Sequence, residues 1–230
     1  MSLNYNQRLF SGGFRKWLHE ARFAWINSVC TEKNIKTNSV LELGCFDGRA
    51  INYLPERPEN YYGFDANWEN GLDQAKELFA NFSNYHFVEA SHPSQLVTNG
   101  IRFDLAISLE TIEHIPPEHV DEYLLKISKV LDGMFLITVP NEKGLLFLVK
   151  YLVKKFILGG AEKYTASELL NATLGRMGNV SRNQHKGFDW EELSKSLSTY
   201  FDIVSVEGVQ FPSLPLSVNA QIGFVLRKKA

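Results

Sequence analysis

Four carboxylates stand at or near the ends of four predicted strands, namely Glu42, Asp65, Glu89 and Glu110. Each strand is a short apolar run, and the carboxyl ends of parallel strands meet at one edge of a sheet. A carboxylate at such an edge can accept hydrogen bonds from both hydroxyls of a ribose. Four acids together also suit a ligand with net positive charge. The sequence therefore predicts a cationic, nucleotide-like ligand at this edge.

The stretch 39–50 is the predicted centre of that site. Its apolar first half predicts a buried parallel strand, and its second half predicts a glycine-bearing turn that opens into a helix. Gly44 and Gly48 would let the backbone turn sharply and approach a ligand closely. The stretch lacks the Gly-Lys-Ser/Thr ending of a phosphate-binding loop, and it lacks the G-x-G-x-x-G of a dinucleotide fold.

A second chemical group follows the fourth predicted strand, as Glu110-Thr111-Ile112-Glu113-His114. A neutral histidine is a natural general base near neutral pH, so His114 is the first candidate and Glu113 the second. A structural histidine that is hydrogen-bonded at the edge of the pocket remains an equal alternative for His114. Asp65 also has an alternative, since it precedes a predicted helix and could cap it.

The ordered motifs of residues 39–141 resemble class I S-adenosylmethionine-dependent methyltransferases. Glu42 to Gly48 matches acid-x-G-x-x-x-G, Asp65 matches the ribose-binding acid, and 110–115 matches E-x-x-E-H-I. Phe46 departs from the pattern, because the family often has a glycine there. The resemblance implies S-adenosylmethionine as cofactor, held by Glu42, Gly44, Cys45, Phe46, Gly48, Asp65, Ala66, Glu89, Ala90, Leu109 and Glu110.

The elements around these motifs alternate between strand and helix. Strands are expected at 39–43, 61–66, 85–90, 103–109, 133–141, 201–209 and 223–227, and helices at 9–29, 69–82, 117–131 and 191–200. Such alternation predicts an α/β fold with a mostly parallel sheet and helices on both faces. The resemblance implies a seven-stranded, Rossmann-like methyltransferase fold whose seventh strand is antiparallel. We expect a single domain over residues 1–230.

The alternation stops between residues 142 and 187, where a helical insert is expected. The segment 144–158 is strongly apolar but is interrupted by Lys150, Lys154 and Lys155, and a second helix is expected at 165–174. Beside the carboxyl edge, an insert can cover the substrate as a cap. Core packing, a dimer face and a peripheral membrane contact through 144–158 are the alternatives.

A metal site is a further alternative, although we expect no metal. Glu110, Glu113, His114 and His185 resemble the metal site of RNA 3′-terminal 2′-O-methyltransferases. Pro140-Asn141 and the stretch 185–190 match that pattern loosely. Two carboxylates and two imidazoles can hold a divalent cation.

Net charge and cysteine content limit the kinds of acceptor and compartment that we expect. The formal charge of −2 over 230 residues gives no overall attraction to nucleic acid. Only two cysteines are present, so a disulfide framework is not expected, and we expect a cytoplasmic protein. We expect an enzyme that O-methylates a small-molecule, glycan (sugar) or lipid-linked acceptor with His114 or Glu113 as base. The alternatives are a metal-dependent RNA 2′-O-methyltransferase and a non-catalytic module that binds S-adenosylmethionine or its product.

Overall fold

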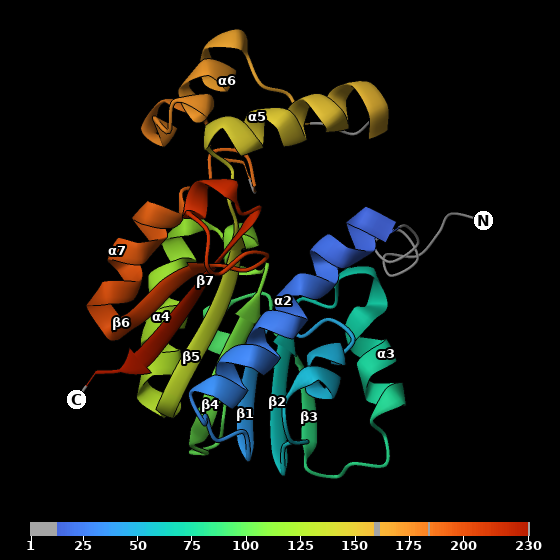
Figure 1. Ribbon diagram of the computed structural model, residues 1–230. Coiled ribbons are helices and arrows are strands. Elements are labelled where there is room, and N and C mark those ends of the chain that lie inside the picture. Colours follow the sequence, from blue (N-terminus) through green and yellow to red (C-terminus); the bar gives the residue numbers. More distant parts are fainter. Residues whose placement is uncertain (1–12, 159–161, 184, 230) are drawn as a thin grey trace.

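A seven-stranded sheet forms the middle layer of the fold (Figure 1). The computed structural model describes residues 13–158, 162–183 and 185–229. The predicted strands are all present, and no boundary differs from the prediction by more than two residues. They are β1 Ser39–Leu43, β2 Asn60–Asp65, β3 Tyr85–Glu89, β4 Phe103–Leu109, β5 Leu131–Pro140, β6 Phe201–Gly208 and β7 Gln221–Lys228.

The strand order is β3-β2-β1-β4-β5-β7-β6. The four pairs among β1 to β5, namely β3–β2, β2–β1, β1–β4 and β4–β5, are parallel. In contrast, β7 is antiparallel to both β5 and β6. This confirms the predicted mostly parallel sheet and its antiparallel seventh strand. The chain moves outwards from β1 in one direction and then from β4 in the other. The reversal lies between β1 and β4, where open α/β sheets form a crevice for ligands.

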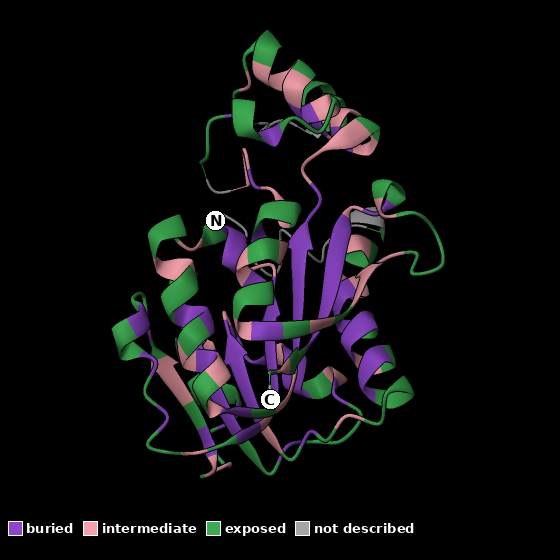
Figure 2. Cartoon of the chain, turned by 90° about the vertical axis from the view of Figure 1, so that its left-hand side faces the viewer, coloured by how far each residue is buried: buried purple, intermediate pink, exposed green. Residues whose placement is uncertain are grey.

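Helices cover both faces, as predicted, and the sheet between them is largely buried (Figure 2). One layer contains α2 Gly13–Glu32, the short helix η1 Arg49–Tyr53 and α3 Gly71–Leu78, and the other contains α4 Pro117–Val130 and α7 Trp190–Tyr200. Each layer packs its apolar side against one face of the sheet, which gives two separate hydrophobic cores. The part of the predicted N-terminal helix before Gly13 lies outside the described residues.

Two helices differ from the prediction. Only the 3-10 turn η1 follows the glycine-bearing loop, where a regular helix was expected. α3 is shorter than the expected 69–82, because Asn67, Glu69 and Asn70 have left-handed backbones and delay its start. The helix ends before Phe79, whose ring packs against Phe87 in the core.

The insert forms a small helical unit beyond the end of β5 (Figure 1). It contains α5 Gly144–Val153, the π-helical turn η5 Lys154–Leu158, α6 Ala166–Thr173 and the turn η6 Met177–Asn179. It has a core of its own, made by Phe147, Tyr151, Ala172, Met177 and Val180. The remaining short helices are η2 Trp68–Asn70, η3 Pro93–Gln95, η4 Ile112–His114 and η7 Leu216–Val218. Among the described residues, no helix is both long and apolar enough to span a bilayer.

Candidate active site

A cavity of about 610 Å³ opens where β1, β2 and β4 end. It lies at the predicted edge of the sheet, and α2, η4 and the segment around His185 complete its walls. Nine of the eleven residues expected to hold a cofactor line it: Glu42, Gly44, Cys45, Phe46, Asp65, Ala66, Ala90, Leu109 and Glu110. Gly48 and Glu89 are not part of the lining. The structure therefore brings together residues from four strands that are distant in sequence.

The turn after β1 is held tightly against its neighbours. Gly44 has φ +80°, and a Cβ atom there would lie 2.0 Å from Thr111 Oγ1. A side chain is therefore excluded both by backbone geometry and by space. Phe46 is also left-handed, with φ +47°, so the position where the resembled family often has glycine does adopt a glycine-like conformation. The Phe46 ring occupies the space beside Gly71.

Asp65 fixes this turn from the end of β2. Its Oδ2 accepts a hydrogen bond from the Phe46 amide at 3.0 Å, and its Oδ1 accepts one from the Asn67 amide at 2.8 Å. Burial raises the pKa of Asp65, and the two amides oppose that rise. η2 begins after Asn67, so Asp65 is not its capping residue. The carboxylate lines the cavity and links the loop after β1 to the loop after β2.

Glu42 of β1 and Glu89 of β3 have different surroundings. Glu42 is buried and accepts a hydrogen bond from the Tyr61 hydroxyl. Burial raises its pKa to about 8, although the hydrogen bond to Tyr61 acts in the opposite direction. Glu89 is exposed and outside the cavity lining, where Ala90 and Ser91 are found instead. β3 is the edge strand of the sheet, whereas β1 lies inside it, so Glu89 stands at the margin of the sheet and Glu42 within it.

Glu110 ends β4 with a left-handed backbone, φ +54°, which directs the chain into η4. Burial raises the pKa of its carboxyl, and the positive charge of Arg22 opposes that rise. Its Oε1 accepts no hydrogen bond from the described residues. Glu110 thus lines the cavity and keeps one buried oxygen without a partner among the described residues.

Arg22 is a lining residue that sequence reasoning missed. It lies on α2 and is largely buried, and its Nε has no hydrogen-bond partner among the described residues. Its charge acts on the pKa values of Glu42, Glu110 and Glu113. A signal was present in the sequence, because Arg22 falls on the apolar face marked by Leu18 and Trp25. A charge on such a face needs a buried partner.

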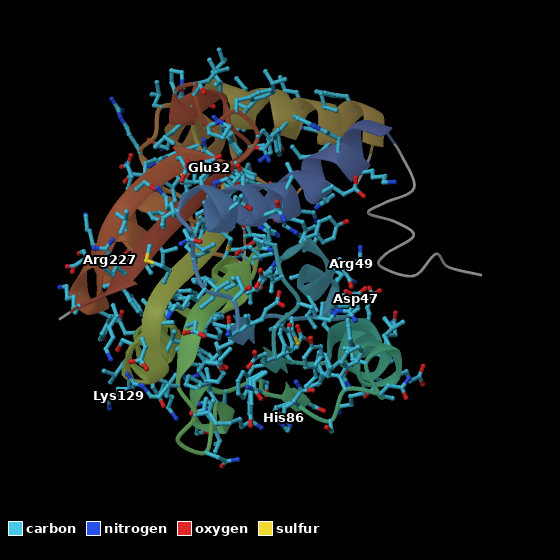
Figure 3. The ribbon with its side chains drawn as sticks, turned by 60° about the horizontal axis from the view of Figure 1, so that its bottom comes forward. Glu32, Asp47, Arg49, His86, Lys129 and Arg227 are labelled. Carbon is cyan, nitrogen blue, oxygen red and sulfur yellow. The ribbon has the colours of Figure 1, made fainter. Side chains whose placement is uncertain are left out.

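Asp47 and Arg49 form another missed pair in the lining. Arg49 Nη2 lies 2.6 Å from Asp47 Oδ2, and the two side chains lie next to each other in Figure 3. Asp47 lies on the loop between β1 and η1, and Arg49 is the first residue of η1. It closes the wall of the cavity beside Phe46 and Trp68.

Glu113, His114 and His185 form a compact cluster beside the cavity. His114 Nε2 and His185 Nδ1 both lie 3.9 Å from Glu113 Oε1, and the two imidazole centroids are 4.4 Å apart. Glu113 is only 1% exposed, and neither of its carboxyl oxygens accepts a hydrogen bond from a described residue. Both histidines line the cavity, whereas Glu113 lies behind them.

The ionisation of the cluster follows from burial. Burial raises the pKa of Glu113 well above its usual range, and the nearby Glu110 charge adds to this. Burial lowers the pKa of His114, and it lowers that of His185 to about 3. Both imidazoles are therefore neutral near pH 7 and can accept a proton or coordinate a cation.

A short hairpin carries His185 to this cluster. Asn183 and Lys186 pair through two backbone hydrogen bonds, of 2.8 and 3.0 Å, and hold the tip of the hairpin. Arg182 Nη2 donates to the Glu113 carbonyl at 3.1 Å, which ties the hairpin to η4. On the other side, Glu168 of α6 accepts hydrogen bonds from Ser181 and Lys186. The insert therefore positions one of the two imidazoles.

The cluster is also a possible metal site. One ligand atom from each of Glu113, His114 and His185 can lie within 4.8 Å of the others. Glu110 does not belong to this group, so three of the four residues in the predicted metal set come together. A carboxylate and two neutral imidazoles are suitable ligands for a divalent transition metal.

Comparisons with known proteins identify a family and a fold for this chain. A family model described as a methyltransferase domain matches residues 14–176. The fold is similar to an S-adenosylmethionine-dependent methyltransferase from Clostridium acetobutylicum ATCC 824, with a TM-score of 0.65, 14% identity and coverage of 98% of this chain and 96% of that chain. The fold is also similar to a 1,6-didemethyltoxoflavin-N1-methyltransferase from Burkholderia thailandensis. The TM-score is 0.60 at 20% identity, with coverage of 93% of this chain and 81% of that chain.

The N-methyltransferase NodS from Bradyrhizobium japonicum WM9, solved in complex with S-adenosyl-L-homocysteine, is a third similar structure. Its TM-score is 0.58 at 14% identity, with coverage of 97% of this chain and 91% of that chain. At these identities the structures show a shared fold. A search among curated protein sequences found no match.

Proposed function

The chain belongs to the methyltransferase domain family, and from this premise we propose that it transfers the methyl group of S-adenosylmethionine to a hydroxyl of a small-molecule, glycan or lipid-linked acceptor. The chain is thus an enzyme, not only a binding module. The observation that carries the proposal is that Asp65, Glu42 and His114 line the same cavity. It combines a cofactor cradle with a neutral base.

The cradle residues have separate roles in this proposal. Asp65, at the end of β2, accepts hydrogen bonds from the ribose. Glu42, Glu110 and their buried neighbour Arg22 face the methionine end, where the cofactor carries both a carboxylate and positive charges. Arg22 is the natural partner for the carboxylate, because guanidinium and carboxylate match in shape and charge.

His114 is the proposed base, and its Nε2 lies 3.9 Å from Glu113 Oε1. Of the two predicted bases only His114 lines the cavity, whereas Glu113 is buried behind it. Methyl transfer is an in-line displacement at an activated carbon, so the enzyme must align donor and acceptor and take up the hydroxyl proton. The lowered pKa of His114 keeps its imidazole neutral and able to accept that proton.

The test is transfer of labelled methyl from S-adenosylmethionine into a fractionated cell extract, with Asp65→Ala as the blank. We expect label in a lipid, glycan or small-molecule fraction, with or without chelator. His114→Asn should lower transfer by about 10²- to 10⁴-fold and leave the affinity for S-adenosylhomocysteine nearly unchanged. If His114→Asn transfers methyl as fast as the wild type does, His114 is not the base.

A second candidate function rests on the cluster Glu113, His114 and His185, whose ligand atoms all lie within 4.8 Å of one another. In this candidate the three residues hold a divalent metal, and the acceptor is an RNA 2′-hydroxyl. A bound metal would polarise the acceptor oxygen and make its proton more acidic. The unpartnered oxygens of Glu113 favour this candidate, because a buried carboxylate usually has a partner.

Direct metal binding separates the two candidates. Titration with Mn²⁺ or Mg²⁺ in a calorimeter should give a binding isotherm that His185→Asn abolishes if the cluster is a metal site. Chelator-sensitive label in RNA would then support the second candidate. The absence of binding at millimolar metal, together with chelator-resistant transfer, would support the first.

A further inference from the structure

Helix α5 carries an exposed apolar stripe. Leu145, Val149, Leu152 and Phe156 recur at intervals of four, three and four residues, which is the spacing of one helical face. Leu145 is 70% exposed, Val149 50% and Phe156 74%. The stripe runs the length of α5 and continues into η5. Large apolar residues that are exposed singly are common, but a continuous stripe of them on one helix is not.

The packed side of the same helix faces in the opposite direction. Phe147 and Tyr151 are buried against Ala172 and Tyr164 in the core of the insert. At 100° per residue, these two positions lie roughly 150° around the helix from the stripe. α5 is therefore apolar on both sides, and only one side is covered by the described residues. A helix that is apolar all round requires a second apolar environment.

Charge is distributed unevenly between the insert and the rest of the chain. Residues 142–187 contain eight lysines and arginines and three glutamates, which gives a formal charge of +5. Because the whole chain carries −2, the remaining residues carry −7. Lys154 and Lys155 are exposed next to the end of the stripe. The insert therefore combines an apolar surface with a basic one on an otherwise acidic protein.

We propose that the insert docks on an anionic lipid bilayer, with the α5 stripe in the interfacial region and its lysines against the headgroups. Helices that lie in a membrane interface combine these two features, since apolar burial and attraction to anionic lipid add together. The proposal concerns a surface of the insert and does not depend on methyl transfer.

The charge of the insert argues against a second copy as the occupant. A two-fold interface would place the same surface of both subunits face to face, and so bring one +5 insert against another. Repulsion would oppose that contact, whereas an anionic surface would attract the insert. Nucleic acid would also attract it but would leave the aliphatic side chains of the stripe uncovered.

Docking in this way would orient the catalytic cavity. α5 directly follows β5 at the carboxyl edge of the sheet, and the cavity opens at the same edge. The insert also carries His185, which lines the cavity. A bilayer contact would therefore bring the active site near the membrane surface, where a lipid-linked acceptor resides.

The experiment is sedimentation of the full-length protein with vesicles of phosphatidylcholine, alone and with phosphatidylglycerol. We expect binding to the anionic vesicles and little to the neutral ones, and weaker binding at high salt. Lys154→Glu with Lys155→Glu should lower the partition coefficient by about 30-fold or more. Leu145→Ser should lower it by about tenfold.

Matched controls lie elsewhere in the chain. Leu78 of α3 is 69% exposed, nearly the same as Leu145, so Leu78→Ser should leave partitioning unchanged. Lys33 and Lys36 are exposed before β1, at the opposite edge of the sheet. The double variant Lys33→Glu with Lys36→Glu is therefore the control for the change in charge. Unchanged affinity for S-adenosylhomocysteine would show that each variant remains folded.

Three outcomes would overturn the proposal. The first is equal partitioning of Leu145→Ser and Leu78→Ser. The second is equally tight binding to neutral vesicles. The third is a dimer in sedimentation velocity that Leu145→Ser dissociates, without any vesicle binding, because it would make the stripe an interface between two copies.

Discussion

At the scale of single residues, Glu42 should make the stability of the protein depend on pH. Burial raises its pKa from 4.5 to about 8, so the folded state binds more protons than the unfolded state between these values. The free energy of unfolding should therefore fall as pH rises through this window, and Glu42 should contribute on the order of a few kcal/mol.

Glu42→Gln tests this directly, because glutamine cannot ionise and keeps an acceptor for the Tyr61 hydroxyl. Urea unfolding without cofactor between about pH 5 and pH 8 should give a smaller decrease for the variant than for the wild type. Asp65, Glu110 and Glu113 also have raised pKa values, so the variant should retain part of the slope. Identical slopes would show that Glu42 is ionised throughout.

Arg22 should contribute to cofactor binding through its buried guanidinium. Loss of a hydrogen bond to a charged group costs about 1.5–3 kcal/mol, so Arg22→Ala should weaken binding of S-adenosylhomocysteine by roughly 10- to 150-fold. Isothermal titration calorimetry measures this. Arg57→Ala is the control, since Arg57 is exposed and outside the cavity. Equal affinities of the two variants would place Arg22 outside the binding site.

The site residues that could be predicted from sequence are those with local signals. Gly44, Asp65 and Glu110 follow recognisable strands, so their positions at the sheet edge follow from chain order. The places of Arg22 and His185 at the cavity depend on packing between segments that are distant in sequence. A local sequence pattern does not reveal such packing. Glu89 was expected at the cofactor and is exposed, because β3 is the edge strand of the sheet, and a local pattern does not give the strand order.

At the scale of elements, the hairpin 181–187 should control activity more than stability. Gly187 has φ +74°, and a Cβ atom there would lie 2.7 Å from the Ser181 carbonyl oxygen. Gly187→Ala should therefore displace the hairpin that carries His185. We expect methyl transfer to fall at least about tenfold, since small displacements of site residues can cost up to 10²-fold.

Gly175 supplies the control for that variant. It has the same φ, +74°, but a Cβ atom there would meet no atom within 4 Å. Gly175→Ala therefore carries the backbone cost without the collision, and it should keep near-normal transfer. Thermal unfolding of both variants separates a local change from a general loss of stability. Equal loss of activity in both variants would exclude the collision as the cause.

The strands were easier to predict than the helix boundaries. Buried parallel strands are nearly continuous apolar runs, as in Phe103–Leu109, and flanking turns limit them. The helix expected after the glycine-bearing turn is only η1, and α3 starts late because three residues adopt left-handed backbones. Propensity does not reveal such conformations, since they are set by the packing of the loops around them.

At the scale of the whole molecule, the strand order places the site. β1 lies between β2 and β4, so the chain leaves the middle of the sheet in both directions and opens a crevice there. Alternation of strands and helices predicts a parallel sheet, but it does not give this order. The family resemblance implied seven strands with an antiparallel seventh, and the structure confirms both. The insert sits beside the same edge and contributes His185 to the cavity. Its role as a cap stays a prediction.

The cavity joins α2, β1, β2 and β4, so a ligand that fills it should stabilise the domain as a unit. S-adenosylhomocysteine at about 100 times its dissociation constant should add roughly 2.7 kcal/mol, or about 5–10 °C in Tm for a chain of this size. Differential scanning calorimetry measures the shift, which Asp65→Ala should reduce. A shift with NADH but not with S-adenosylhomocysteine would contradict the assigned cofactor, because only a ligand bound to the folded state raises Tm.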